Sequence, residues 1–165
     1  MKHPLLMTTI VFLGTLTAGC GHGTLSDFSF TPPEGWEFRD PLPGMKFKAA
    51  IGPARAGFAS NINVVDEAFN GSLAAYAEGN LTAIQKAFKN FRLLKQETFT
   101  TTNGEPAVRM VTENEQNGRQ LRQTFYFFGK GNTKFVVTCT TLAEGGEKLD
   151  PVFEASMKTF RFDPK

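Results

Sequence analysis

The chain has 165 residues, with 18 Lys and Arg against 16 Asp and Glu, and a formal net charge of +2. This near balance provides no electrostatic footprint for nucleic acid, so a nucleic-acid partner is not expected. Its two histidines, His3 and His22, both precede the region expected to fold. That placement excludes Ser–His and Cys–His catalysis within the domain and disfavours a zinc enzyme.

The N-terminus has the organisation of a secretory signal. Lys2 provides a positive charge, and the mostly apolar run over residues 5–16 is too short to span a bilayer as a permanent helix. The run ends in Leu-Thr-Ala-Gly-Cys at residues 16–20. This ending resembles the lipobox of bacterial lipoproteins, in which small residues precede a Cys that is lipidated and becomes the mature N-terminus. Thr17 departs from that pattern, because the family usually has Leu three residues before the Cys.

The resemblance implies that residues 1–19 are a signal peptide and that Cys20 carries the lipid. The alternative is an ordinary signal peptide with an incidental Cys. Several acyl chains on one residue anchor a protein stably, whereas a single chain does not. Residues 20–27 would be the lipidated Cys and a small, polar tether, which reaches roughly 25 Å when fully extended. The domain would therefore lie close to the membrane surface.

Gly21 follows the Cys. In Gram-negative lipoproteins an Asp at that position typically retains the protein in the inner membrane, so the resemblance favours the outer membrane here. We expect a lipid-anchored protein on the extracytoplasmic face of the cell envelope. The membrane is the outer membrane in a Gram-negative cell and the cell membrane otherwise.

Residues 28–163 are expected to form one domain, since no repeat, low-complexity tract or second domain is visible. Asn103-Gly104 and Asn117-Gly118 are typical of hairpin turns, and the strands around them are expected to form an antiparallel meander. Turn signals and apolar alternation predict strands at residues 28–30, 36–38, 45–51, 61–66, 93–100, 106–113, 119–128, 133–141 and 159–162, with a loop at 52–57.

The main helix is expected over residues 72–91. Ser72 can act as its N-cap, because a hydroxyl can accept a free N–H of the first turn. Apolar residues then recur in steps of three and four, which places them on one face of a helix. These residues are Leu73, Tyr76, Ala77, Leu81, Ile84, Ala87, Phe88 and Phe91, and Phe88 is expected to be buried.

The strands at 119–128 and 133–141 contain runs that are apolar on both faces, and such strands need cover on both sides. The main helix can cover one side. A C-terminal helix with Asp150 as N-cap and Pro151 at its first position could cover the other. The expected fold class is therefore α+β, a single α/β/α sandwich with a mainly antiparallel sheet.

Five short motifs together resemble the PsbP-like fold, and within it the bacterial DcrB-type lipoproteins. They are Phe30-x-x-Pro33-x-Gly35-Trp36, Asn61-Ile62-Asn63-Val64, Gly104-x-Pro106-Ala107, Phe135-Val136-Val137-Thr138 and Phe160-Arg161-Phe162. The resemblance covers nearly the whole mature chain. It implies the same sandwich and a non-enzymatic role, since relatives include photosystem II accessory proteins, envelope lipoproteins and chaperones. It transfers no catalytic residue.

Cys139 lies in an apolar strand and by alternation shares a face with Phe135 and Val137. A redox-active or nucleophilic thiol is one interpretation. A small buried apolar residue is the preferred one, because no His or flanking base could lower the pKa of this thiol. If Cys20 is lipidated, Cys139 has no disulfide partner.

The charged residues are expected to be solvated. Calcium would need about six oxygen ligands, and no loop has that density of acidic residues. The acidic clusters are Asp66-Glu67, Glu113 with Glu115, and Glu144 with Glu147; the basic positions Lys86, Lys89 and Arg92 could touch lipid headgroups but suit the wet face of a helix. Asn61 and Asn63 are interpreted as hydrogen-bonding residues at a strand edge, and Trp36 as core.

These observations favour a non-catalytic protein-binding or assembly factor, anchored to the membrane by its N-terminal lipid and docking on another envelope protein. The alternative is a small-ligand or metal-ion carrier in the extracytoplasmic space. No cofactor, metal site or catalytic residue is expected. A docking domain should expose an apolar patch with a polar rim, whereas a carrier should have a pocket with converging polar groups.

Overall fold

The computed structural model of the protein describes residues 28–41 and 45–164. The predicted signal peptide, Cys20 and the tether lie outside these described residues. Within them, no helix is long and apolar enough to cross a membrane. The elements in chain order are β1 (Phe28–Ser29), β2 (Glu37–Arg39), β3 (Ala49–Arg55), β4 (Phe58–Ala68), α1 (Leu73–Ala87), β5 (Lys89–Thr100), β6 (Pro106–Gln116), β7 (Arg119–Lys130), β8 (Thr133–Leu142), η1 (Gly146–Leu149), α2 (Asp150–Lys158) and β9 (Arg161–Phe162).

Seven strands form one sheet in the order β2-β3-β4-β8-β7-β6-β5, and β1 pairs with β9 in a separate two-stranded ribbon. Every pair of neighbouring strands is antiparallel. At the turn between β6 and β7, Asn117 and Gly118 have φ angles of 50° and 74°. Two positive φ angles match the twist of the flanking strands in a two-residue hairpin. The predicted meander is confirmed, with strands longer than expected.

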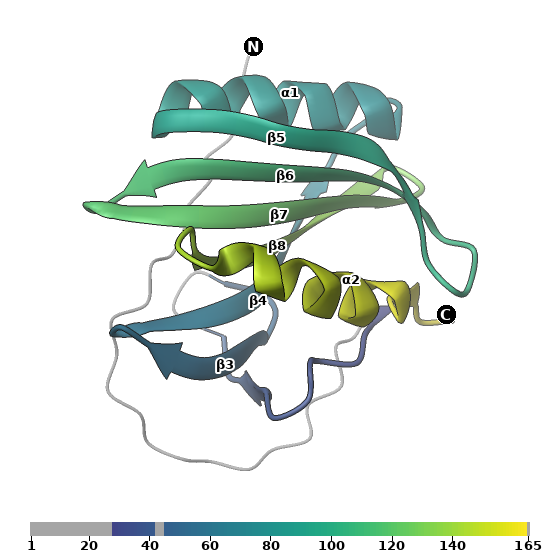
Figure 1. Cartoon of the computed structure of the whole chain (residues 1–165). Coiled ribbons are helices and arrows are strands. Elements are labelled where there is room, and N and C mark those ends of the chain that lie inside the picture. Colours follow the sequence, from purple (N-terminus) through teal and green to yellow (C-terminus); the bar gives the residue numbers. More distant parts are fainter. Residues whose placement is uncertain (1–27, 42–44, 165) are drawn as a thin grey trace.

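Helix α1 covers one face of the sheet and contacts β5, β6 and β7 (Figure 1). Its N-terminus is capped as expected, since the Ser72 hydroxyl accepts the Ala75 backbone N–H at 3.1 Å. Apolar side chains from the helix and the sheet meet in a buried cluster made of Tyr76, Ala77, Leu81, Ile84, Met110, Phe125, Phe127 and Val136. This cluster is the packing that the helical spacing of apolar residues requires.

Helix α2 covers the opposite face, where it contacts β7, and it lies below that strand in the view of Figure 1. Tyr126 and Phe128 alternate with their neighbours on β7 and point to this side. The Phe128 ring stacks on Phe160 with centroids 4.0 Å apart, and Phe160 stacks on Phe28 at 5.3 Å. Phe153 and Met157 of α2 are buried in the same cluster. The sheet therefore lies between two helical layers, and the predicted α/β/α sandwich is confirmed.

The main helix ends earlier than residue 91, so its predicted C-terminus is wrong. Phe88 is extended, with φ −108° and ψ 139°, and Asn90 has a φ of 51°. The chain turns there because Lys89 already pairs with Glu115 of β6. Phe88 and Phe91 contact the α1 cluster from outside the helix, and both are half-buried rather than buried. Their spacing continued the helical period although they lie beyond the helix.

The strand expected at residues 45–51 lies further along the chain, and most of the expected loop at 52–57 belongs to β3. Its pairing with β4 shifts register between Ile51 and Ala54. Pro53 fits at this irregularity because β2 pairs with β3 only over residues 49–51, so the Pro nitrogen has no neighbouring β2 residue to bond. A proline inside a strand of this kind reads as a loop signal in the sequence.

Candidate functional site

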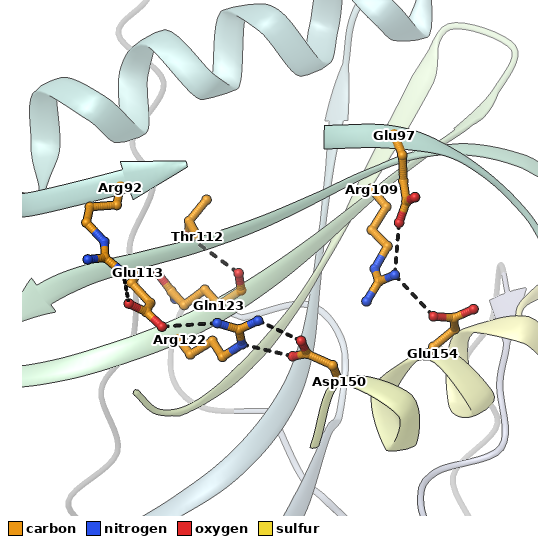
Figure 2. A network of polar contacts seen from close by, with 9 residues as sticks. All are labelled: Arg92, Glu97, Arg109, Thr112, Glu113, Arg122, Gln123, Asp150 and Glu154. Carbon is orange, nitrogen blue, oxygen red and sulfur yellow. Dashed lines mark hydrogen bonds and ion pairs between the residues drawn. The ribbon is translucent and has the colours of Figure 1, made fainter. Parts of the chain in front are cut away.

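Arg122 joins the sheet to α2. Its Nε and Nη2 donate to Asp150 Oδ1 and Oδ2 at 3.0 and 2.6 Å, and its Nη1 donates to Glu113 Oε1 at 3.0 Å (Figure 2). The hydrogen bonds that Arg122 donates to Asp150 raise the pKa of Arg122 above its ordinary value. A bidentate guanidinium–carboxylate pair fixes orientation as well as distance. Asp150 is the first residue of α2 and makes no side-chain cap, so its expected N-cap role is wrong.

Arg109 makes a second bridge from β6 to α2. Its Nη1 donates to Glu97 Oε1 at 2.9 Å and to Glu154 Oε2 at 3.1 Å (Figure 2). Hydrogen bonding from Lys95, and then the charges of Lys95 and Arg109, lower the pKa of Glu97. The two arginines thus hold α2 over the aromatic cluster.

Cys139 is fully buried on the α2 side of β8, on the same face as Phe135 and Val137, as expected. Burial raises the pKa of its thiol, which keeps the sulfur protonated. A protonated, inaccessible thiol is neither a nucleophile nor a metal ligand. The preferred interpretation of Cys139 as a small buried residue is confirmed.

The prediction that the acidic clusters are solvated loop charges is partly wrong. Asp66 pairs with Lys46 at 2.6 Å, and Glu67 accepts the Tyr76 hydroxyl at 3.0 Å. Both belong to β4, and Glu113 and Glu115 likewise belong to β6, whereas Glu144 and Glu147 are exposed outside the strands. Over residues 28–41 and 45–164, no three His, Cys, Asp or Glu side chains are grouped to hold a metal ion.

Trp36 and the two Asn residues of β4 have structural roles. The Trp36 indole is half-buried, lies against Gly52 and meets Phe153 edge-on at 5.8 Å. Asn63 donates to Asn61 Oδ1 at 3.3 Å, and Asn61 donates to a backbone carbonyl at 3.2 Å. The hydrogen bonding was expected, but β4 lies between β3 and β8, so the expectation of a strand edge is wrong.

Sequence reasoning missed a ladder of buried amides on the α1 side of the sheet. Asn114 donates to Gln123 at 2.8 Å, Gln116 donates to both at 2.8 and 3.0 Å, and Gln123 donates to Thr140 at 3.3 Å. The signal in the sequence is a run of five polar residues at 112–116 on β6, with uncharged Thr112, Asn114 and Gln116 alternating with two Glu. Because these side chains bond to one another, they stabilise the sheet and offer few groups to a ligand.

Two of the three large exposed apolar residues in the described part of the chain lie on β5. Leu93 and Leu94 are 39% and 40% exposed, and the third large exposed apolar residue in the described ranges, Val65, lies four strands away on β4 at 42%. β5 stands at one end of the strand order, so one edge of this 12-residue strand has no neighbouring strand in the described sheet. We call Arg92, Leu93, Leu94 and Lys95 the β5 patch.

The β5 patch has a polar rim. Arg92 pairs with Glu113 at 2.9 Å and Lys95 pairs with Glu97 at 2.8 Å. Pairing with β6 shifts register between Leu93 and Lys95. The sequence placed Lys86, Lys89 and Arg92 on the wet face of a helix. This is wrong for Lys89 and Arg92, which lie on β5, whereas Lys86 is in the last turn of α1. Bulges and lysines on an edge strand prevent uncontrolled pairing of strands between molecules.

No protein-family model matches the chain, and no curated protein matches it in sequence. Solved structures do match. A protein of unknown function, PA94 from Pseudomonas aeruginosa, has a TM-score of 0.61 and 19% identity over 84% of this chain and 99% of that chain. LpqN of Mycobacterium tuberculosis, which is involved in cell envelope biogenesis, has a TM-score of 0.63 and 15% identity over 87% and 88%.

The cyanobacterial PsbP of Synechocystis sp. PCC 6803, CyanoP, matches with a TM-score of 0.57 and 9% identity over 88% of this chain and 98% of that chain. Identities this low establish the fold alone. The chain therefore has a PsbP-like fold, as its short motifs indicated. Neither PsbP nor LpqN carries the name of an enzyme.

Proposed function

We propose that the protein is an envelope lipoprotein of the DcrB type, anchored through Cys20, that docks on another envelope protein without catalysing a reaction. Residues 1–19 are its signal peptide, residues 20–27 its lipidated Cys and tether, and residues 28–163 its docking domain. The lipid holds it on the extracytoplasmic face, at the outer membrane of a Gram-negative cell or otherwise at the cell membrane. The partner binds the β5 patch.

The observation that carries this proposal is the coincidence of exposed leucines with a free sheet edge. Docking energy comes mainly from burying a few large side chains at the centre of a patch, inside a polar rim. Leu93 and Leu94 provide such a centre, and the ion-paired Arg92 and Lys95 provide the rim. Because the register shift interrupts β5, the partner contacts these side chains and does not add a continuous strand.

Two further observations support the proposal, one on the absence of catalysis and one on the location. The sequence of residues 28–164 contains no His, and its one Cys, Cys139, is buried with a raised pKa. The likeness to LpqN, a protein involved in cell envelope biogenesis, supports a location in the envelope. The alternative function is a small-ligand or metal-ion carrier, and among the described residues a group of polar atoms beneath α2 favours the small-ligand form.

The anchor is tested by replacing Cys20 with Ala. The variant should accumulate as an unlipidated precursor, because the thioether to the lipid can no longer form, and mass spectrometry of the purified protein measures this. Ordinary cleavage of the variant with no lipid on the wild-type protein would contradict anchoring.

Docking is tested separately, in the lipidated protein, with Leu93→Asp and Leu94→Asp together. We expect this double variant to lose its crosslinked envelope partner and to keep its unfolding midpoint, since both side chains are on the surface. Val65→Asp is the matched control, because Val65 is equally exposed on a distant strand. If the double variant retains the partner, or if the protein co-purifies with a small molecule or metal in its place, the carrier function is favoured.

A further inference from the structure

Three buried polar atoms beneath α2 lack a hydrogen-bond partner among the described residues. They are Arg109 Nε, Thr124 Oγ1 and Tyr126 Oη. The residues that carry them are between 0% and 6% exposed. A buried polar group without a partner costs free energy, so most such groups in folded proteins bond to protein or to ordered water. Three of them on one side of the sheet need a common explanation.

The three residues lie on adjacent strands and face the same helix. Arg109 is directly opposite Tyr126 in the pairing of β6 with β7, and its Cζ lies 5.8 Å from the centroid of the Tyr126 ring. Thr124 is two residues before Tyr126 on the same face of β7, directly opposite Cys139. Glu154 of α2 binds Arg109 at 3.1 Å, which places the helix over this group.

The chemistry of the group limits what can bind there. Arg109 Nε is only a donor, whereas the two hydroxyls can both donate and accept. An anion is disfavoured, because Arg109 is already paired with Glu97 and Glu154. A cation is disfavoured by the guanidinium itself. Burial raises the pKa of Tyr126, so its hydroxyl remains protonated and able to donate. A small neutral molecule that accepts and donates fits these requirements.

We propose that Arg109, Thr124 and Tyr126 form an internal water-binding site that ties β6 and β7 together beneath α2. Water accepts the Arg109 N–H and exchanges hydrogen bonds with the two hydroxyls. A buried water typically makes about three such bonds. Glu97 links Arg109 to Lys95 of the β5 patch, but the water site does not rest on the proposed docking function or on the anchor.

A direct test is a high-resolution crystal structure of the full chain carrying Cys20→Ser, which removes the lipid. We expect ordered water within hydrogen-bond distance of at least two of the three atoms. Water–protein cross-relaxation in NMR spectra should show a long-lived contact with the Tyr126 hydroxyl. A dry site in the crystal, or protein groups bonded to these atoms, would overturn the proposal.

A double-mutant cycle tests the same site by energetics, with Tyr126→Phe and Thr124→Val in the Cys20→Ser chain. Each single variant should lower the urea midpoint, and the double variant should lower it by less than the two losses combined, because one water serves both hydroxyls. Tyr76→Phe is the control: its hydroxyl bonds to Glu67 on the other side of the sheet, so its loss should add to that of Thr124→Val. An unchanged or raised midpoint for Tyr126→Phe would contradict the water site.

Discussion

The two helices cover opposite faces of one sheet, and they are attached to it by different means. Helix α1 has 15 residues, a Ser72 cap and an apolar face packed on an apolar cluster. Helix α2 has nine residues and no side-chain cap. It is held by the ion pairs of Arg109 and Arg122 and by its place over a stack of Phe rings.

The difference shows how local and distant parts of the chain divide the work of folding. The α1 side uses interactions with a regular period along the sequence, from the cap to the apolar steps. The α2 side joins residues far apart in the chain, since Phe28 stacks on Phe160 and Arg122 binds Asp150. If this comparison is right, the α2 side should depend on single, non-repeated contacts.

The largest expected effect is from Phe128→Ala. This ring is fully buried and stacks on Phe160, so its loss should cost about 3–5 kcal/mol of unfolding free energy. Phe88→Ala should cost roughly half as much, because Phe88 is half-buried outside α1. Urea unfolding of both variants measures the difference. Equal losses would mean that Phe88 is part of the core after all.

Arg122→Met should cost about 3 kcal/mol, because it leaves Asp150 without its partner in a largely buried site and leaves Glu113 paired with Arg92 alone. The Arg122 side chain is 13% exposed, whereas that of Arg92, which binds the same Glu113, is 67% exposed. Arg92→Met is therefore the control, with an expected loss below about 1 kcal/mol. Similar losses for the two variants in urea unfolding would show that burial does not decide the strength of these pairs.

Ser72→Ala should cost about 1 kcal/mol, because the Ala75 N–H loses its acceptor at the start of α1. Hydrogen exchange should then quicken in the first turn of α1 and not in α2. A loss of protection in both helices would contradict the independent attachment of the two layers.

The smallest effect is expected from pH. The pKa of Glu97 is lowered in the folded protein, so its contribution to stability is complete above the unfolded value of about 4.3 and is lost as the pH falls through the lower folded value. Wild-type protein should therefore lose slightly more stability than Glu97→Gln as the pH falls from 5 to 3. The limits of this pH window are given to within about one pH unit. If the unfolding free energies of the two proteins, measured with urea, change in parallel with pH, Glu97 does not contribute to the attachment of α2.

The sequence predicts the α1 side well because its signals are local. Ser72, the apolar steps from Leu73 to Ile84, and Asn117-Gly118 all have the predicted roles. The predicted C-terminus of α1 is wrong because Phe88 and Phe91 keep the helical spacing while they pack from beyond the helix, Phe88 at its C-cap and Phe91 on β5. Asp150 has the composition of a cap, and only the folded chain shows that it binds Arg122 instead.

The candidate site was less predictable. An exposed leucine on an edge strand has the same local sequence as a buried one, so Leu93 and Leu94 became visible only once β5 was placed at the end of the sheet. The unpartnered atoms Arg109 Nε, Thr124 Oγ1 and Tyr126 Oη cannot be recognised along the chain either, because their residues meet through pairing between strands. Such features depend on topology, which single-sequence patterns describe poorly.

The claim that the β5 patch binds an envelope partner is tested most directly by photo-crosslinking in intact envelopes. A photoreactive amino acid is placed at Leu94 or, in a matched protein, at Val65. We expect one discrete crosslinked partner from position 94 and none from position 65, with the product lost when Leu93→Asp is added. Crosslinks from position 65 alone, or equal products from both positions, would contradict the assignment of the β5 patch as the docking surface.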